Sequence, residues 1–471
     1  MPDSLARSEA VGRRALVAAV AVLLLWLPLP FGSVVPWSHA VLQVATFLLL
    51  ALAAALAHDL GGLRRAGLPA AAIAAVALLG LLQSLQWPQA IVRTISPEHA
   101  RLQAQATALV SGVEGAPAVA GTLSLAPSVS RAAALTWLAV AACLLVAAAA
   151  GASRRERRVL GAAVTVSGLF QVFYGAQRLA AREATIWGVE APGDISRLRG
   201  TFVNSDHLAL YLELALPVAF ALGWWAARRA RDETALERRT VLVAVPVLLW
   251  LTLFVGVAFS GSRAGLAAAA AGAIAQGGLL AARRRRWRFG AAGVVAVAVG
   301  LGAVTVIGLQ QGLGRWLGTS QYELTWNERL VVYRATAALW QRFPLTGTGL
   351  ATYREASPTV VPREASESWY WHAHNDYLEV LATTGVVGAA LLLVVALVVV
   401  HRLGRIALHA TRSEDRAAGL AALGAIAAVA VHSLFDFGLS LPANAATLAI
   451  VCGAALAIKV ERTSVATTAP R

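Results

Sequence analysis

Residues 369 to 388 concentrate the side chains that could carry acid–base chemistry. Two histidines, an amide and a carboxylate (His372, His374, Asn375 and Asp376) stand directly before a long apolar run. A neutral imidazole accepts a proton near neutral pH, so one histidine could act as general base on a hydroxyl. Histidine and aspartate are also zinc ligands, and the His-x-His-x-Asp spacing places all three on one face of an extended segment. The segment indicates a site where a polar loop enters a membrane.

The zinc hypothesis lacks a complete set of ligands in the sequence. No further Cys/His cluster is present, and the scattered candidates are His207, Glu213, His432 and Asp436. We therefore favour a general base over a metal site. A histidine that is merely hydrogen-bonded at an interface is the ordinary alternative, and the polar neighbours of His374 argue against it.

Several arginines lie in connections that we expect to face outward, where short connections normally contain few arginines. Arg263 lies in the tight link Ser260-Gly-Ser-Arg263, Arg197 and Arg199 precede an apolar run, and Arg329 opens an amphipathic segment. Guanidinium groups bind phosphate oxygens in a bidentate manner, so converging arginines would hold a diphosphate. Extension toward lipid head groups is the alternative, and we favour it for Arg197.

Two acidic residues lie within apolar runs, where a charge is costly and indicates function. Glu213 lies about two turns, roughly 10 Å, into its run. Asp436 stands at the end of another run, in His432-Ser-Leu-Phe-Asp436, where pairing with an external arginine is the structural alternative. Gly385 and Gly388 would most simply allow close helix packing.

The composition indicates a membrane protein with many spans. The 471 residues are 58% hydrophobic and only 14% charged, whereas soluble domains carry about 25% charged residues. The apolar runs have the length of a bilayer-crossing helix, and lipid leaves no partner for unpaired backbone groups. We predict an all-α bundle of twelve transmembrane helices, at 15–31, 38–57, 68–87, 132–152, 159–178, 207–226, 241–259, 264–282, 289–309, 378–400, 417–437 and 441–458.

The distribution of arginine predicts the orientation of these spans. All of the 40 basic residues except Lys459 are arginine, and they fall in short clusters in alternate connections, so the net charge of +15 does not indicate nucleic acid binding. The positive-inside rule then puts both termini in the cytoplasm. Three longer connections face outward: 88–131, which we expect to be irregular, 179–206, and 310–377, which contains an amphipathic helix over 326–343.

The chain is predicted to be one membrane domain with an external subdomain. Its parts are residues 1–131 with three spans and the first outer loop, 132–309 with the central spans, 310–377 with the large loop, and 378–471 with the last three spans and a tail. The two cysteines, Cys143 and Cys452, lie inside apolar runs and form no disulfide framework. The first run lacks a small-residue cleavage site, so we expect no cleavable signal.

These residues together resemble the O-antigen ligase and polymerase superfamily. Its ligase motif is His, then Asn, Ser or Gln, nine residues, Gly, two residues, then Gly, Thr or Tyr; His374-Asn375 and Gly385-Val-Val-Gly388 fit it. Over about residues 160–455 the chain also resembles the family at Arg199-Gly-Thr-Phe-Val-Asn204, Ser260-Gly-Ser-Arg263, Pro344-Leu-Thr-Gly-Thr-Gly349, His432-Ser-Leu-Phe-Asp436 and Leu441-Pro-Ala-Asn444. Ser205-Asp206-His207 departs from the Asn-His of many members, which leaves the role of His207 open.

The resemblance implies transfer of a glycan from undecaprenyl diphosphate to an acceptor hydroxyl on the periplasmic face of the bacterial inner membrane. It implies catalytic roles for His374 and Asn375, and diphosphate binding by Arg199, Arg263 and Arg329. Supporting roles would fall to Asp376, His372, Glu213, Asp436 and His207. No metal or other cofactor is implied. The partners would be a lipid-linked glycan donor, membrane lipids, and a glycan, lipid A core or other hydroxyl acceptor.

Three other functions are compatible with parts of the sequence. A polymerase of the same superfamily would extend lipid-linked repeat units. A transporter of the lipid-linked glycan would also need many spans and external arginines, but its charged groups should line a cavity through both leaflets. A non-catalytic scaffold would tolerate single changes at the external arginine and histidine positions.

Overall fold

The computed structural model of the chain describes residues 2–56, 61–111, 121–191, 193–284, 326–360 and 370–460. Within these residues the fold is almost entirely helical, and nine helices are long and apolar enough to cross a membrane. They are α2 (Pro36–Leu56), α3 (Gly61–Ser84), α6 (Pro127–Ala150), α7 (Arg154–Ala181), α8 (Ser205–Arg229), α9 (Leu236–Phe259), α10 (Arg263–Arg284), α15 (Asp376–His409) and α16 (Ser413–His432). The predicted all-α, multi-pass membrane protein is confirmed.

The three remaining predicted spans differ from these nine helices. Helix α1 (Pro2–Trp26) covers most of the span predicted at 15–31 but ends before Pro28 and Pro30, because proline cannot donate the backbone hydrogen bonds of a helix. Helix α17 (Pro442–Leu456) fits the last predicted span and has only 15 residues. The span predicted at 289–309 lies outside the described residues.

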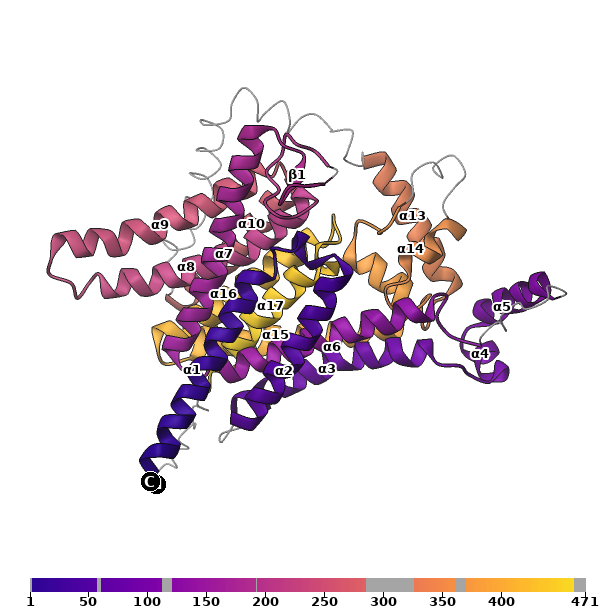
Figure 1. Cartoon of the computed structure of the whole chain (residues 1–471), viewed down its shortest axis with the longest axis horizontal. Helices are drawn as coiled ribbons and strands as arrows, with labels where there is room; N and C mark the ends of the chain where they lie inside the picture. The colour runs from indigo at the N-terminus through magenta and orange to yellow at the C-terminus, as the bar shows by residue number, and fades with distance from the viewer. Residues whose placement is uncertain are drawn as a thin grey trace, which may run out of the picture.

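The N-terminal half of helix α8 is buried in the bundle. Its first four turns are almost completely buried, and it packs against α7, α9, α10 and α16 (Figure 1). Small residues allow the backbones to approach closely; a Cβ at Gly453 of α17 would lie 2.1 Å from the Leu144 carbonyl oxygen of α6. This packing brings the start of α8 and the end of α16 together.

The connection expected to be irregular at 88–131 instead contains two helices, α4 (Gln89–Ile95) and α5 (Pro97–Val110). Pro97 at the first helical position and the Ala- and Gln-rich sequence after it favour the helix. His99 anchors α5, because its ring packs edge-on against Phe343, with centroids 4.6 Å apart. The prediction overlooked this helix-forming sequence.

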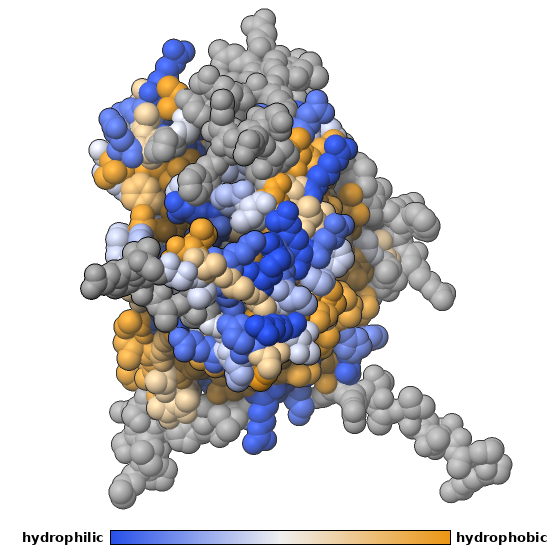
Figure 2. Space-filling view, turned by 90° about the vertical axis from the view of Figure 1, so that its right-hand side faces the viewer, coloured by the Kyte–Doolittle hydropathy of each residue, from blue (hydrophilic) through white to orange (hydrophobic). Residues whose placement is uncertain are grey.

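The same end of the molecule carries the predicted amphipathic helix. It is α13 (Trp326–Arg342), followed by α14 (Tyr353–Ala356), and both lie beside α4 and α5 at the right of Figure 1. Figure 2 shows this face with hydrophilic residues gathered in its middle and hydrophobic surface at its edges. The face therefore combines a water-compatible centre with a membrane-compatible rim.

Helix α15 is broken at Gly385, which was expected only to allow close helix packing. Gly385 has φ 63° and ψ −168°. The Val386 amide donates to the Pro344 carbonyl at 2.9 Å, and the Val387 amide donates to the Leu345 carbonyl at 3.2 Å. In the opposite direction, the turn donates to the helix: the Thr348 amide donates to the Ala382 carbonyl at 3.0 Å. The Pro344–Gly349 turn and the broken helix therefore form one backbone-paired unit.

A buried glutamine of α3 completes this unit. The side-chain nitrogen of Gln83 donates to the Thr346 carbonyl at 2.5 Å, and its side-chain oxygen accepts from the Leu350 backbone amide at 2.9 Å. Gln83 is 1% exposed, and nothing in the sequence around it singled it out. It ties the Pro344–Gly349 turn to α3 and helps to hold that turn against α15.

Candidate functional site

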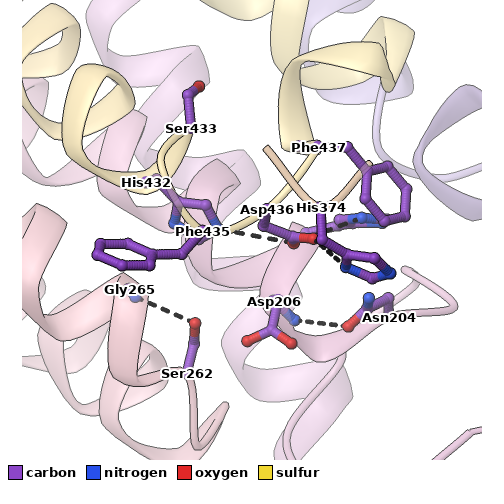
Figure 3. Close-up of polar contacts among 12 residues, drawn as sticks. Asn204, Asp206, Ser262, Gly265, His374, His432, Ser433, Phe435, Asp436 and Phe437 are labelled. Carbon is purple, nitrogen blue, oxygen red and sulfur yellow. Dashed lines mark hydrogen bonds and ion pairs between the residues drawn. The ribbon is translucent and has the colours of Figure 1, made fainter. Parts of the chain in front are cut away.

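Three imidazoles converge on one carboxylate at one end of the bundle. The Oδ1 atom of Asp436 lies 3.3 Å from Nδ1 of His374, while Oδ2 lies 3.6 Å from Nε2 of His207 and 3.8 Å from Nε2 of His432 (Figure 3). At these separations the contacts are electrostatic rather than short hydrogen bonds. Asp436 was predicted as a supporting residue, but its described partners are histidines and not the external arginine considered as an alternative.

Four different elements position these groups. His207 is in the first turn of α8, His432 ends α16, and Asp436 lies in the turn after α16, where its amide donates to the His432 carbonyl at 3.1 Å. Asp436 therefore lies beyond the helix, although the predicted span reached residue 437. His374 precedes α15 and adopts a left-handed backbone conformation with φ 50°, which costs energy for a non-glycine residue and often marks a functional position.

The electrostatic environment keeps Asp436 ionised. Its burial alone would raise the pKa of the carboxyl, but the histidines at positions 207, 374 and 432 lower that pKa well below its ordinary value. The Asp436 side chain is only 5% exposed. A buried carboxylate of this kind can orient an imidazole and stabilise its protonated form.

A second carboxylate supports this group from deeper in the bundle. The Nδ1 atom of His432 lies 2.9 Å from Oε1 of Glu213, and both side chains are completely buried. A side chain at Gly265 of α10 would come within 3.0 Å of the same Glu213 oxygen. His432 thus lies between two carboxylates and connects Glu213 to Asp436.

Asn375 and Asp376 hold the start of α15 against the end of α16. The Asn375 side chain caps α15 by accepting from the Leu378 amide at 3.0 Å and donates to the Leu434 carbonyl at 2.9 Å. Asp376 accepts from the Ser433 hydroxyl at 2.7 Å. These contacts fix the backbone just before Asp436, so both residues help to position the adjacent His374.

His372 belongs to the wall of the site. Its Nδ1 lies 2.8 Å from Glu379 Oε1, and its ring stacks on Phe437 with centroids 4.0 Å apart. Burial lowers the pKa of His372, but the Glu379 carboxylate outweighs this effect, so the pKa is raised overall. Phe437 also packs edge-on against His374 and His207; it was overlooked, although it directly follows Asp436.

The three side chains of the His-x-His-x-Asp pattern separate in the structure. His372 turns to Glu379, His374 to Asp436, and Asp376 to Ser433. Among the described residues, no group of three or more His, Cys, Asp or Glu side chains has an arrangement that could hold a metal ion. The half metal site considered from the spacing is not assembled, because helix capping and packing direct neighbouring residues differently.

The arginines fall into two groups. Arg329 of α13 donates to the Phe435 carbonyl beside Asp436, and the exposed Arg263 begins α10. Arg199 is instead buried beneath the hairpin of β1 (Thr185–Ile186) and β2 (Val189–Glu190), where it donates to the Ala191 carbonyl at 3.0 Å. No described contact joins Arg199 to His374.

Arg197 does not extend toward lipid, contrary to the favoured interpretation. Its side chain is 8% exposed, donates to the Ser260 carbonyl at 2.5 Å and pairs with Asp206 at 2.9 Å. It therefore clamps the link before α10 onto the first turn of α8. Arg197 and Arg199 are only two positions apart in the sequence, yet their side chains have different partners.

Two helix N-termini lie close to His374 and Asp436. Figure 3 shows the starts of α8 and α10 on the same side of the Asp436–His374 pair. Asn204 caps α8 by accepting from the Asp206 amide at 2.9 Å, and Ser262 accepts from the Gly265 amide at 3.0 Å at the start of α10. The partial positive charge of helix N-termini attracts anions, so these ends and Arg263 favour an anionic ligand.

Comparison with known families matches this region. The family model described as O-antigen ligase matches residues 247–393, which include Arg263, Arg329 and His374. No curated protein gives a significant match to the chain. The residues that complete the charge cluster, His207, Glu213, His432 and Asp436, lie outside the matched stretch.

Proposed function

We propose, from the premise that this chain belongs to the O-antigen ligase superfamily, that it transfers a glycan from a polyprenyl diphosphate to an acceptor hydroxyl. The reaction would take place at the outer, periplasmic face of the bacterial inner membrane. The single observation that carries the proposal is the contact of His374 with the buried Asp436 carboxylate, with the starts of α8 and α10 on one side of this pair. The proposed base and the proposed anion-binding surface therefore lie together.

In this proposal the two ring nitrogens of His374 have separate tasks. Nδ1 faces Asp436, so a proton on Nδ1 is held by that carboxylate and leaves the Nε2 lone pair available. The acceptor hydroxyl transfers its proton to Nε2 while its oxygen attacks the anomeric carbon of the donor sugar. The bond from that carbon to the diphosphate oxygen breaks, and the polyprenyl diphosphate leaves with its negative charge.

Binding of the departing diphosphate supplies the second part of catalysis. Arg263 and the starts of α8 and α10 would stabilise its charge, and Arg329 adds a cation next to the Asp436 turn. Arg199 is assigned a weaker role, because its described hydrogen bond is to the backbone below the hairpin. His207 and the Glu213–His432 pair would hold Asp436 in position.

Reconstitution in liposomes with an undecaprenyl-diphosphate oligosaccharide tests the proposal. The donor is supplied with and without a lipid A core acceptor, and products are sized by gel and mass spectrometry. Glycan on the core would identify a ligase, and longer lipid-linked chains without the core would identify a polymerase. Translocation of the donor with no new bond would instead support a transporter.

The matched variants are His374→Ala and His401→Ala. Loss of general base catalysis should slow transfer by about 10²–10⁴-fold in the first variant. His401 is exposed on the distal half of α15, so its variant should retain full activity. Full transfer by a correctly folded His374→Ala protein would refute the assignment of the base.

A further inference from the structure

A cavity of about 80 Å³ lies between α7, α8, α16 and α17, away from the candidate site. Its walls are apolar and include Gly161, Val164, Val218, Ala418 and Ala421. A water-sized group occupies roughly 10–15 Å³ of such a volume, so the cavity accommodates a short row of methylene-sized groups. Its apolar lining suits a hydrocarbon chain and offers little to a polar ligand.

The mouth of the cavity is basic. Arg154, Arg157 and Arg158 line it. Arg157 is engaged in an ion pair with Asp415, so it serves to hold α7 against α16. Arg158 lies over the ring of Trp225, 4.5 Å from its centroid, an arrangement that orients the guanidinium without neutralising its charge.

Arg154 is the second cation that can meet a ligand. Its Nη1 is 4.0 Å from Glu414 Oε1, and its side chain is 42% exposed, so this ion pair is weak. Both Arg154 and Arg158 can therefore turn toward an anion at the mouth. The cavity is lined by apolar side chains, by these two arginines and by Glu414, so its two free-turning cations and apolar interior complement an anionic phospholipid.

The cavity opens at the opposite membrane boundary from His374. On α8, His207 belongs to the candidate site and Trp225 lines the cavity. The separation of 18 positions corresponds to about 27 Å of helix, close to the thickness of the hydrocarbon core. A lipid held here belongs to the other leaflet from a donor diphosphate bound near His374.

We propose that this cavity binds one anionic phospholipid. The phosphate lies against Arg154 and Arg158, and the first part of one acyl chain enters between the four helices. Basic pockets between transmembrane helices favour such head groups through charge. The occupant stabilises the four-helix contact, and its binding does not depend on the proposed glycan transfer.

Native mass spectrometry of the full chain tests the proposal after exchange into phosphatidylglycerol or phosphatidylcholine. We expect the wild-type protein to retain one phosphatidylglycerol and to retain phosphatidylcholine much less. Removal of both arginines in Arg154→Ala/Arg158→Ala should weaken retention of phosphatidylglycerol by roughly 25-fold, from the usual contribution of each basic residue near an anionic lipid. Inorganic phosphate should not compete, because the acyl chain contributes to binding.

Two further variants separate the site from general charge and folding effects. Ala418→Leu fills the cavity while keeping the arginines and should also lose the lipid. Arg155→Ala removes the same charge from an exposed neighbour that does not line the cavity, and it should bind normally. Equal retention by all variants, equal retention of phosphatidylcholine, or displacement of the bound lipid by a polyprenyl phosphate would overturn the proposal.

Discussion

Asp436 is a buried carboxylate whose described partners are imidazoles. Because the carboxylate contacts His207, His374 and His432, it can stabilise whichever of these rings gains a proton. A guanidinium partner would remain charged throughout and would hold the carboxylate in one arrangement. The choice of histidine therefore suits a site in which a proton is transferred.

Replacement of this carboxylate should impair transfer without unfolding the protein. In Asp436→Asn, the protonated His374 lacks a charged partner, so we expect glycan transfer to fall by about 100-fold. The measurement is the initial rate with a labelled lipid-linked donor. Asp232→Asn, an exposed change at the far end of α8, should leave that rate unchanged, and comparable rates in both variants would contradict the role of Asp436.

The His372–Glu379 pair predicts a pH dependence of stability. The folded-state pKa of His372 is raised by Glu379, so its stabilising contribution is complete below the unfolded value of about 6.5 and disappears as pH rises through the folded value. Thermal unfolding of the wild-type protein should therefore shift to lower temperature as pH rises above 6.5. His372→Gln should lose this component, and His401→Gln should keep it.

At the scale of elements, the break in α15 links the Pro344–Gly349 turn to the segment that follows His374. The turn Pro344–Gly349 and the segment around Gly385 exchange backbone hydrogen bonds, so the residues after His374 are attached to the subdomain that carries α13. That subdomain also supplies Tyr333, whose hydroxyl donates to the His374 carbonyl at 3.0 Å. The break therefore helps to hold His374 in place.

Two glycines of the same helix provide a matched test of this break. A Cβ at Gly385 would lie 2.2 Å from the Leu345 carbonyl oxygen, and its positive φ is unfavourable for other residues. Gly385→Ala should reduce the free energy of unfolding by roughly 2–6 kcal/mol, from backbone strain and overpacking together. Gly404 has nothing within 4 Å of the corresponding position; Gly404→Ala should be neutral or slightly stabilising in the same denaturation assay.

At the scale of the whole molecule, the two ends of the bundle differ in chemistry. One end carries the cluster around Asp436, while the other carries arginines at the starts of α7 and α16 and at the end of α8. The arginine-rich end fits the cytoplasmic side under the positive-inside rule. This polarity is the basis for proposing a periplasmic site.

Labelling of single introduced cysteines tests that orientation. Both natural cysteines, Cys143 and Cys452, are buried, so background labelling should be low. A membrane-impermeant maleimide added outside spheroplasts should label Gln105→Cys and Glu190→Cys, but should label Arg155→Cys only after permeabilisation. All three positions are exposed, and labelling of the Arg155 position in intact spheroplasts would reverse the orientation.

The sequence by itself determined the class of protein and singled out most of the residues that gather around Asp436. Hydropathy is a property of a local run, so nine apolar helices could be predicted from their own residues. The spacing of His374, Asn375 and Gly385 likewise indicated the family that the comparison later matched. Errors arose where local sequence was ambiguous, as in the overlooked helices α4 and α5.

Only the tertiary structure decided which charged groups meet. The pairing of Glu213 with His432 joins residues 219 positions apart, and Gln83 reaches Thr346 across 263 positions. Such contacts depend on the rotation and register of packed helices, which side-chain volumes along their whole lengths determine. For the same reason, Arg197 and Arg199 have different hydrogen-bond partners although they are close in the sequence. Asp436 likewise contacts three histidines that come from separate parts of the chain.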